Sequence, residues 1–354
     1  MTCEADDLIR DPLFQLNAVL WMTQPLPSAA EIKPLLYSRG FRVRAIAPPL
    51  APPPDLQLRA QEKRVDLKAS VRPDVIVADE RGRFAVTECK ASSFGPGSST
   101  AEQARSLLVV GGPRCSEVLA LSDAAVSRSV VAYVMPEDQR DVFLPTLAQL
   151  DGELATAKLS PGTACIMGLR ASARAISVVA DEEARSFFNL PNQTSTFLTV
   201  ERDTCPRPLY FIPYDPDNEQ SPAERKLCQR QLYERFLGGV VCATGRAIPP
   251  SNVLLRPERM LNDAMFGMFE HWENRDATRH MKKLCRVFMT AVRTAVEPVV
   301  PDAIQFEPAV GWHITLADHD MQERMLKALM RFSCEDLILG PPRPPDLFDS
   351  VEDD

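Results

Sequence analysis

Two short strand-forming runs with a turn between them constrain the fold of this chain most. Val75–Val77 and Phe84–Val86 are rich in β-branched and aromatic side chains and flank the tetrapeptide Asp79-Glu80-Arg81-Gly82. Asp at the first position and Gly at the fourth are typical of a type I turn whose last residue is left-handed, as in three-residue hairpin loops. Both faces of the hairpin are largely apolar, so the sequence predicts a strand pair covered on both sides within a larger sheet.

The same turn predicts which side chains share a face of the hairpin. It places Asp79 opposite Arg83 and, counting outward, Asp74 opposite Glu88. Because side chains alternate along a strand, Asp74, Glu88 and Lys90 point to one side. Burying unpaired charges costs on the order of several kcal/mol each, so a fold keeps them there only with partners, a metal or a function.

These three residue types match the metal-dependent hydrolysis of phosphodiesters. Asp74 and Glu88 supply the hard oxygen ligands that Mg²⁺ prefers, and they leave positions for water and phosphate. Mg²⁺, with Mn²⁺ as a substitute, stabilises in-line displacement at phosphorus and lowers the pKa of a bound water. Lys90 is the candidate base, or the cation that faces the phosphate. The alternative interpretation is an ion-pair cluster that satisfies itself and binds nothing.

The spacing of these residues resembles a known family. Pro73-Asp74, thirteen intervening residues and then Glu88-Cys89-Lys90 resemble the motif of the PD-(D/E)XK nuclease superfamily. The resemblance covers residues 28–136. It implies an α/β fold, the restriction-endonuclease-like mixed sheet core flanked by helices.

The resemblance also implies two further site residues. Members often carry an additional acid on the first core helix, where Glu31 matches as a third metal ligand and Glu62 is a rival. Some carry a glutamine on the helix after the lysine strand, and Gln103 matches that position as a catalytic residue.

Patterns elsewhere in the chain predict the remaining elements. A capping box, Ser28 with Glu31, opens a helix over 29–38, and a second one, Ser99 with Glu102, opens a helix through Val110. The polar segment Leu56–Val71 reads as a strand pair or flap. The other expected helices cover 11–22, 137–158, 221–237, 257–272 and 275–296, and the other expected strands 41–46, 130–135, 165–169 and 175–179.

Composition excludes several classes of protein. The chain has 354 residues, 45% apolar and 25% charged, which fits two or three globular domains. Its nine cysteines form no C-x-x-C pair, its first residues are acidic, and no apolar run is long enough to cross a bilayer. We therefore expect reduced thiols, a cytoplasmic location and no membrane partner.

Charge bears on the expected substrate. The net charge is −8, yet residues 39–90 hold eleven Lys and Arg against seven Asp and Glu. This local excess is expected to meet a nucleic-acid backbone. The candidate contacts are Arg42, Arg44, Lys63, Arg64 and Lys68.

The sequence thus predicts a magnesium-dependent nuclease in four parts. These are an N-terminal helix (1–27), a nuclease domain (28–181), a mostly helical domain (190–339) and a Pro-rich, acidic, disordered tail (340–354). The expected substrate is DNA, with RNA as an alternative, in restriction, phage defence, repair or recombination. A protein partner or a homo-oligomer is expected to load it. The competing hypothesis is a non-cleaving recognition or scaffold subunit of a nucleic-acid-processing complex.

Overall fold

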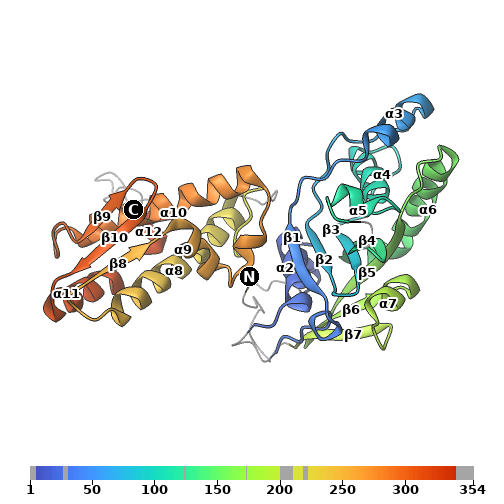
Figure 1. Ribbon diagram of the computed structural model, residues 1–354. Helices are drawn as coiled ribbons and strands as arrows, with labels where there is room; N and C mark the ends of the chain where they lie inside the picture. The colour runs from blue at the N-terminus through green and yellow to red at the C-terminus, as the bar shows by residue number, and fades with distance from the viewer. Residues whose placement is uncertain are drawn as a thin grey trace, which may run out of the picture. The chain divides into compact units, whose positions relative to one another are not determined.

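The computed structural model describes residues 5–26, 31–122, 125–172, 174–199, 210–217 and 222–339. The chain divides into two compact units, each described here by itself (Figure 1). The first unit contains residues 1–211 together with His271–Asn274. The second contains residues 212–270 and 275–354. The predicted tail, 340–354, lies outside the described residues.

The first unit is built on a seven-stranded mixed sheet whose strands neighbour one another in chain order. The middle pairs β3–β4 and β4–β5 are parallel, and the outer pairs are antiparallel. This confirms the expected α/β class with a mixed sheet. The strands are β1 (Arg42–Ile46), β2 (Val75–Ala78), β3 (Arg83–Cys89), β4 (Arg128–Pro136), β5 (Thr163–Ser172), β6 (Ala175–Ala180) and β7 (Thr194–Thr199).

The central hairpin has the predicted register. Val75 pairs with Thr87 and Ala78 with Phe84, so Asp74 and Glu88 lie opposite each other one step farther along. In the turn, the Gly82 amide donates to the Asp79 carbonyl over 3.2 Å, and Gly82 has φ of +77°. A Cβ on Gly82 would lie 2.5 Å from the Ala125 carbonyl oxygen, so both conformation and space require glycine here.

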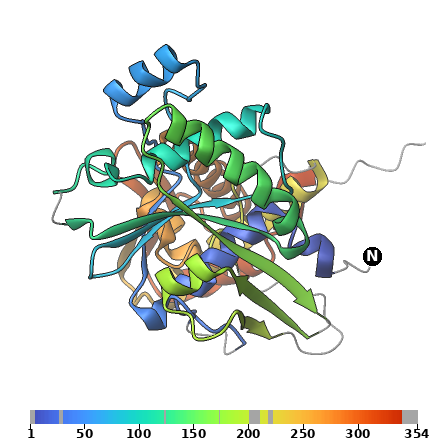
Figure 2. The same cartoon turned by 90° about the vertical axis from the view of Figure 1, so that its right-hand side faces the viewer.

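Helices cover both faces of this sheet (Figures 1 and 2). The helices α4 (Ser99–Val110) and α6 (Arg140–Thr156) pack over the face that carries Ile76, Val86 and Tyr133. The helix α2 (Pro12–Thr23) contacts β1 to β4. The shorter elements of this unit are α1 (Ala5–Leu8), the 3₁₀ turn η1 (Tyr37–Arg39), α3 (Pro54–Lys63), α5 (Cys115–Val118), η3 (Glu137–Gln139) and α7 (Glu182–Phe188).

The helix predicted over 29–38 is wrong in its described part, residues 31–38. Pro34 lacks the amide that a helix interior needs. Around Ile32 the chain is extended instead: the Lys33 amide donates to the Phe197 carbonyl over 2.7 Å, and Ile32 bridges to Leu198 in β7, before the 3₁₀ turn η1. The helix that packs on the sheet before β1 is α2, which Asp11 caps by accepting from the Leu13 amide over 2.9 Å.

The strand pair or flap predicted over Leu56–Val71 is also wrong. Its first half belongs to α3, which begins at Pro54 and ends where Arg64 adopts φ of +56°. The residues of α3 are mainly good helix formers. Its proline, Pro54, stands in the first turn, where no intrahelical amide is needed.

The remaining predicted elements of this unit are confirmed within a few residues, but its boundary moves. The strand β7 was not predicted, and it pairs with β6 at the edge of the sheet. The sheet therefore extends beyond 181. The N-terminal helix is one of its covering helices and not a separate part.

The second unit consists mainly of helices, as expected, and adds a small antiparallel sheet that was not predicted. Its strands are β8 (Ser251–Leu255), β9 (Ile304–Glu307) and β10 (Gly311–Leu316), in the order β8-β10-β9. These strands are only four to six residues long, and β9 and β10 alternate apolar and polar residues, over Ile304–Glu307 and Trp312–Leu316. The helices are α8 (Pro222–Arg246), α9 (Pro257–Ala264), η4 (Met268–His271), α10 (Arg275–Val296), α11 (His319–Met330) and α12 (Cys334–Leu339).

Across the residues that the structure describes, every helix is too short or too polar to traverse a lipid bilayer.

Candidate active site

The three charged residues of the hairpin lie together at the end of β2 and β3 that is farther from the turn. Asp74 directly precedes β2, Glu88 is the second-last residue of β3, and Lys90 follows that strand. Glu88 lies on the face covered by α4, together with Ile76 and Val86. The alternation that predicted a shared face is therefore reproduced by the backbone pairing.

Glu88 is the centre of this cluster and is only 3% exposed. Its Oε1 accepts from Lys90 Nζ over 2.6 Å and from Gln103 Nε2 over 2.8 Å. Asp74 is held from the other strand, since its Oδ2 accepts from the Cys89 amide over 2.6 Å. The fold thus brings Asp74, Glu88, Lys90 and Gln103 together, although Gln103 comes from α4 and the others from the hairpin.

Two buried polar atoms on this face of β3 and β4 have no hydrogen-bond partner among the described residues. They are Glu88 Oε2 and the hydroxyl of Tyr133. Tyr133 stands beside Glu88 on β4, where the two residues form a register pair. Leaving a buried polar atom unpaired costs about 1–3 kcal/mol, and more for a charged group. An oxygen left open in this way fits a ligand that the chain itself does not contain.

The cluster perturbs the ionisation of its own members. Burial, followed by the negative charge of Asp74, raises the pKa of Glu88 to about 8. Burial also raises the pKa of Asp74 above its ordinary value. Burial opposes the charge on Lys90, but the carboxylate of Glu88 outweighs it and raises the pKa of that ammonium group. Two acids that resist ionisation beside one ammonium group favour an additional cation.

The carboxylates of this site suit Mg²⁺, which keeps water or phosphate ligands, better than a metal ion that is coordinated by protein side chains alone. No group of three or more His, Cys, Asp or Glu in the described ranges could hold a metal by protein ligands alone. Asp74 and Glu88 therefore offer at most two carboxylates. Mg²⁺ commonly uses one or two carboxylates and keeps water or phosphate oxygens in its other positions. Of the Glu88 oxygens, Oε2 is the one without a hydrogen-bond partner among the described residues.

The structure places the two additional candidate acids elsewhere. Glu31 lies on no helix and is exposed; its backbone carbonyl accepts from Thr199 at the edge of the sheet. Glu62 is exposed on α3. The third metal ligand expected from the resemblance is therefore missing from this arrangement, because the helix that would have carried Glu31 does not form.

The five basic candidates are scattered over the unit. Lys68 is near the cluster, and its charge lowers the pKa of Glu88. Arg42 pairs with Ala78, about 13 Å along β2 from Asp74 at roughly 3.3 Å per residue. Its guanidinium stacks on Tyr37 and donates to backbone carbonyls, so it is engaged within the chain.

The other three basic candidates line two pockets. Arg44 lines one of about 720 Å³ at the turn end of the hairpin, together with residues of that turn. Lys63 and Arg64 line another, of about 560 Å³, with Arg105 of α4. These pockets, with Lys68, place basic groups at several points of the unit and not in one continuous stripe.

Sequence reasoning missed two residues of the site. Gln15 on α2 is fully buried, and its Nε2 donates to the Lys90 carbonyl over 3.1 Å and to the Ile9 carbonyl over 2.8 Å. Tyr133 appeared in the sequence only as part of a strand. The available signal for Gln15 was its place, with Asn17 and Thr23, among the few polar residues of a helix whose other residues are apolar on all sides.

Comparisons of the chain with protein-family models, with curated proteins and with solved structures found no match. The site is therefore interpreted from its own chemistry.

Proposed function

We propose that this protein is a metal-dependent nuclease that hydrolyses phosphodiester bonds of DNA, with a fold of the PD-(D/E)XK type. One observation carries the proposal. Glu88 is almost completely buried, shares one oxygen with Lys90 and Gln103, and leaves the other oxygen open. Burying a carboxyl group whose second oxygen has no partner is costly, and a divalent cation is a ligand that would offset this cost.

The order of elements supports the same interpretation. A helix (α2), three antiparallel strands (β1 to β3), a helix (α4) and a parallel strand (β4) occur in this order, with α3 inserted between β1 and β2 and the short α5 before β4. The resemblance leads us to expect this order, with α2 in the place we had assigned to 29–38. The acid-acid-lysine set lies at the edge of this core where β2 begins and β3 ends.

In this proposal Asp74 and Glu88 hold the metal, which polarises the phosphate and lowers the pKa of a bound water. Lys90 stays charged because Glu88 raises its pKa, so its ammonium group is suited to offset the charge on the phosphate. Gln103 donates to Glu88 Oε1 and fixes the orientation of that carboxylate. Gln15 fixes the backbone of Lys90 from the opposite side of the sheet.

A cleavage assay on the full-length protein tests the proposal. Plasmid, linear duplex, single-stranded DNA and RNA are incubated with Mg²⁺, Mn²⁺ or EDTA. Asp74→Asn, Glu88→Gln and Lys90→Met should each reduce cleavage by about 10²-fold or more. Glu31→Gln and Glu62→Gln are matched controls, because both acids are exposed, and should cleave like the unmodified protein.

A metal-binding measurement separates this proposal from the scaffold alternative. Mn²⁺ binding, followed by electron paramagnetic resonance, should disappear in Asp74→Asn and Glu88→Gln and persist in Glu62→Gln. A protein that neither binds Mn²⁺ at this cluster nor cuts any of the four substrates would instead fit the non-cleaving subunit. Cleavage of RNA alone would replace DNA as the substrate and leave the site assignment intact.

A further inference from the structure

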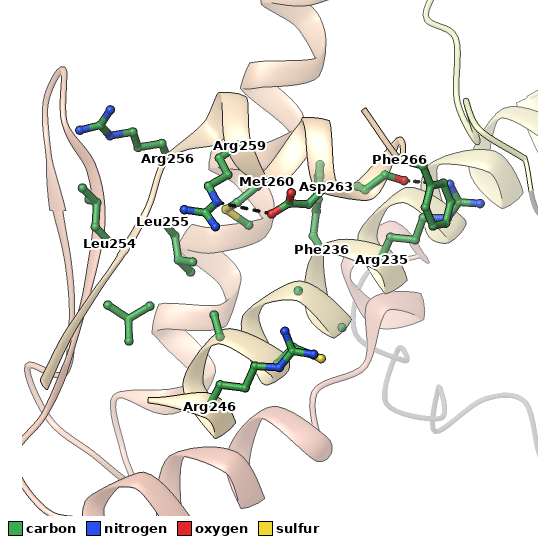
Figure 3. A pocket seen from close by; sticks show the side chains of 16 residues that line it. Arg235, Phe236, Arg246, Leu254, Leu255, Arg256, Arg259, Met260, Asp263 and Phe266 are labelled. Atoms are coloured by element: carbon green, nitrogen blue, oxygen red, sulfur yellow. Dashed lines mark hydrogen bonds and ion pairs between the residues drawn. The ribbon is translucent and has the colours of Figure 1, made fainter. Parts of the chain in front are cut away.

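The second unit contains a pocket of about 760 Å³ that the proposed nuclease site does not use (Figure 3). Its walls are the C-terminal half of α8, the strand β8 and the helix α9 with the turn that follows it. A volume of this size is in the range of pockets that bind small organic ligands, roughly 300–1,000 Å³.

The charge of this pocket is strongly positive. Its lining includes one acid, Asp263, and four arginines. The arginines are Arg235, Arg246, Arg256 and Arg259. The acid is only loosely paired, since Arg259 Nε lies 3.8 Å from Asp263 Oδ2. In Figure 3, Arg259 on α9 and Arg246 on α8 stand on two different walls of the pocket, with the Arg259 side chain 79% exposed, whereas Arg256 is turned outward. The lining therefore keeps a positive charge that it does not neutralise itself.

Arg235 adds a half-buried cation at one end of the pocket. Its Nη1 donates to the Ala264 carbonyl over 2.8 Å, and its guanidinium lies 5.1 Å from the centre of the Phe266 ring. No carboxylate within the described ranges forms an ion pair with it. Burial lowers the pKa of this arginine to about 10. A guanidinium in this setting is suited to a ligand that brings its own negative charge.

Two glycines keep one wall of the pocket open. Gly238 and Gly239 lie in the middle of α8, and a Cβ built on either one meets no atom within 4 Å. Glycine in a helix interior costs about 0.5–1 kcal/mol relative to alanine. Since packing within the chain does not require glycine at these positions, their effect is to leave room beside the arginines.

The rest of the lining is apolar. Val253 and Leu255 contribute half-buried side chains from the edge strand β8, and Phe236 and Met260 contribute from the helices. Phe266 is 39% exposed at the end that carries Arg235. A ligand that matches this surface has an anionic group and a flat, largely apolar part, the combination found in a phosphorylated nucleoside.

We infer that this arginine pocket, lined by α8, β8 and α9, binds a phosphorylated nucleoside. The phosphate meets Arg246 and Arg259, and the base lies against the apolar wall. The ligand is either a free nucleotide or one nucleotide of a nucleic-acid strand, since both present the same chemistry. The inference does not rest on the proposed nuclease activity, because every residue that carries it lies in the second unit.

Isothermal titration calorimetry on full-length protein in EDTA at fixed ionic strength tests this site. The ligands are AMP, ATP, a short single-stranded oligonucleotide and inorganic phosphate. AMP or the oligonucleotide should bind at least about tenfold more tightly than phosphate, and Arg246→Gln and Arg259→Gln should each weaken that binding about tenfold. Tighter binding of mononucleotides or of the oligonucleotide identifies the source of the nucleoside.

Gly239→Leu separates a ligand pocket from a structural feature. Leucine favours the helix and fills open space, so the variant should melt at or above the temperature of the unmodified protein and yet lose nucleotide binding. Gly245→Ala, on the same helix but outside the pocket lining, should retain binding.

Three results would overturn the inference. They are equal binding of phosphate and nucleotide, nucleotide binding that neither arginine substitution weakens, and undiminished binding by a folded Gly239→Leu variant. Each measurement is repeated in Asp74→Asn, where the pocket should bind as before. A failure of the proposed nuclease activity can thereby be told apart from a failure of nucleotide binding in this pocket.

Discussion

Glu88 shows how a single side chain can be held at an energetic cost. Two donors satisfy its Oε1, while its Oε2 is buried without a partner among the described residues. Replacing such a cluster by apolar residues is often neutral or stabilising in proteins. The arrangement is therefore better explained by a ligand than by its contribution to stability, and its titration provides a direct test.

Glu88→Gln should change how stability depends on pH in the absence of metal. The pKa of Glu88 rises from 4.5 to about 8 on folding. Between these values the folded chain holds a proton that the unfolded chain has lost, so stability falls as pH rises through this window, by at most about 1.4 kcal/mol per pH unit. Asp74, whose pKa is also raised, adds to the same trend.

Urea-dependent hydrogen exchange of the β3 amides at pH 5, 6.5 and 8 measures this effect. The free energy of unfolding should fall less steeply with rising pH in Glu88→Gln than in the unmodified protein. Glu62→Gln, exposed on α3, should keep the original slope. Parallel slopes in all three proteins would show that Glu88 ionises normally.

Gln103→Leu should weaken metal binding without removing a ligand. Its amide holds Glu88 Oε1 over 2.8 Å, and the loss of such outer contacts commonly costs about 10–100-fold in metal affinity or activity. Mn²⁺ titration measures the change, with Gln61→Leu on the exposed side of α3 as the control. Equal affinities for both variants would contradict a positioning role for Gln103.

At the scale of elements, the turn of the central hairpin sets the geometry of the site. Its length fixes the pairing of Val75 with Thr87, and this pairing puts Asp74 across from Glu88. A slip of one residue would turn every side chain of β3 to the other face. Gly82, with its left-handed backbone, is the residue that allows the turn to close against Ala125.

Gly82→Ala should destabilise the first unit by about 1–3 kcal/mol, because alanine resists positive φ and its Cβ would clash with the Ala125 carbonyl. Gly152→Ala is the matched control. It lies within α6, has open space around its Cβ, and should stabilise by about 0.5–1 kcal/mol. Urea unfolding of both variants gives the comparison, and a neutral Gly82→Ala would show that the turn can take another form.

At the scale of the whole molecule, the two units are not contiguous in sequence. His271–Asn274 belongs to the first unit, although the residues on both sides of it belong to the second. Trp272 bridges to Ile46 of β1, and the Glu273 amide donates to the Ile46 carbonyl over 2.9 Å. The edge strand of the large sheet is thus paired with a segment more than 200 residues away.

Trp272→Ala should therefore loosen β1 of the first unit. Trp272 is 7% exposed, and removing a buried tryptophan costs about 3–5 kcal/mol. Hydrogen exchange of the Arg42–Ile46 amides should accelerate. Trp312→Ala is the control: that residue is equally buried but lies on β10 of the second unit, so the β1 amides should keep their protection.

The sequence by itself determined the features that depend on interactions between residues close together in the chain. The turn chemistry of Asp79–Gly82 set the register of β2 and β3, and alternation then placed Asp74, Glu88 and Lys90 on one face. The capping residues predicted α4 to within one position, since Ser98 is the cap and not Ser99. These features depend on residues that are close in the chain, so a short stretch of sequence contains all the forces that shape them.

Only the tertiary structure decided the features that depend on distant partners. Pairing with β7 drew the segment around Glu31 into an extended form, which removed the expected third acid. Packing of α2 brought Gln15 to the backbone of Lys90, and the parallel pairing of β4 set Tyr133 beside Glu88. The free energy of these contacts comes from surfaces far apart in sequence, and local patterns carry no record of which distant surface will be buried against which.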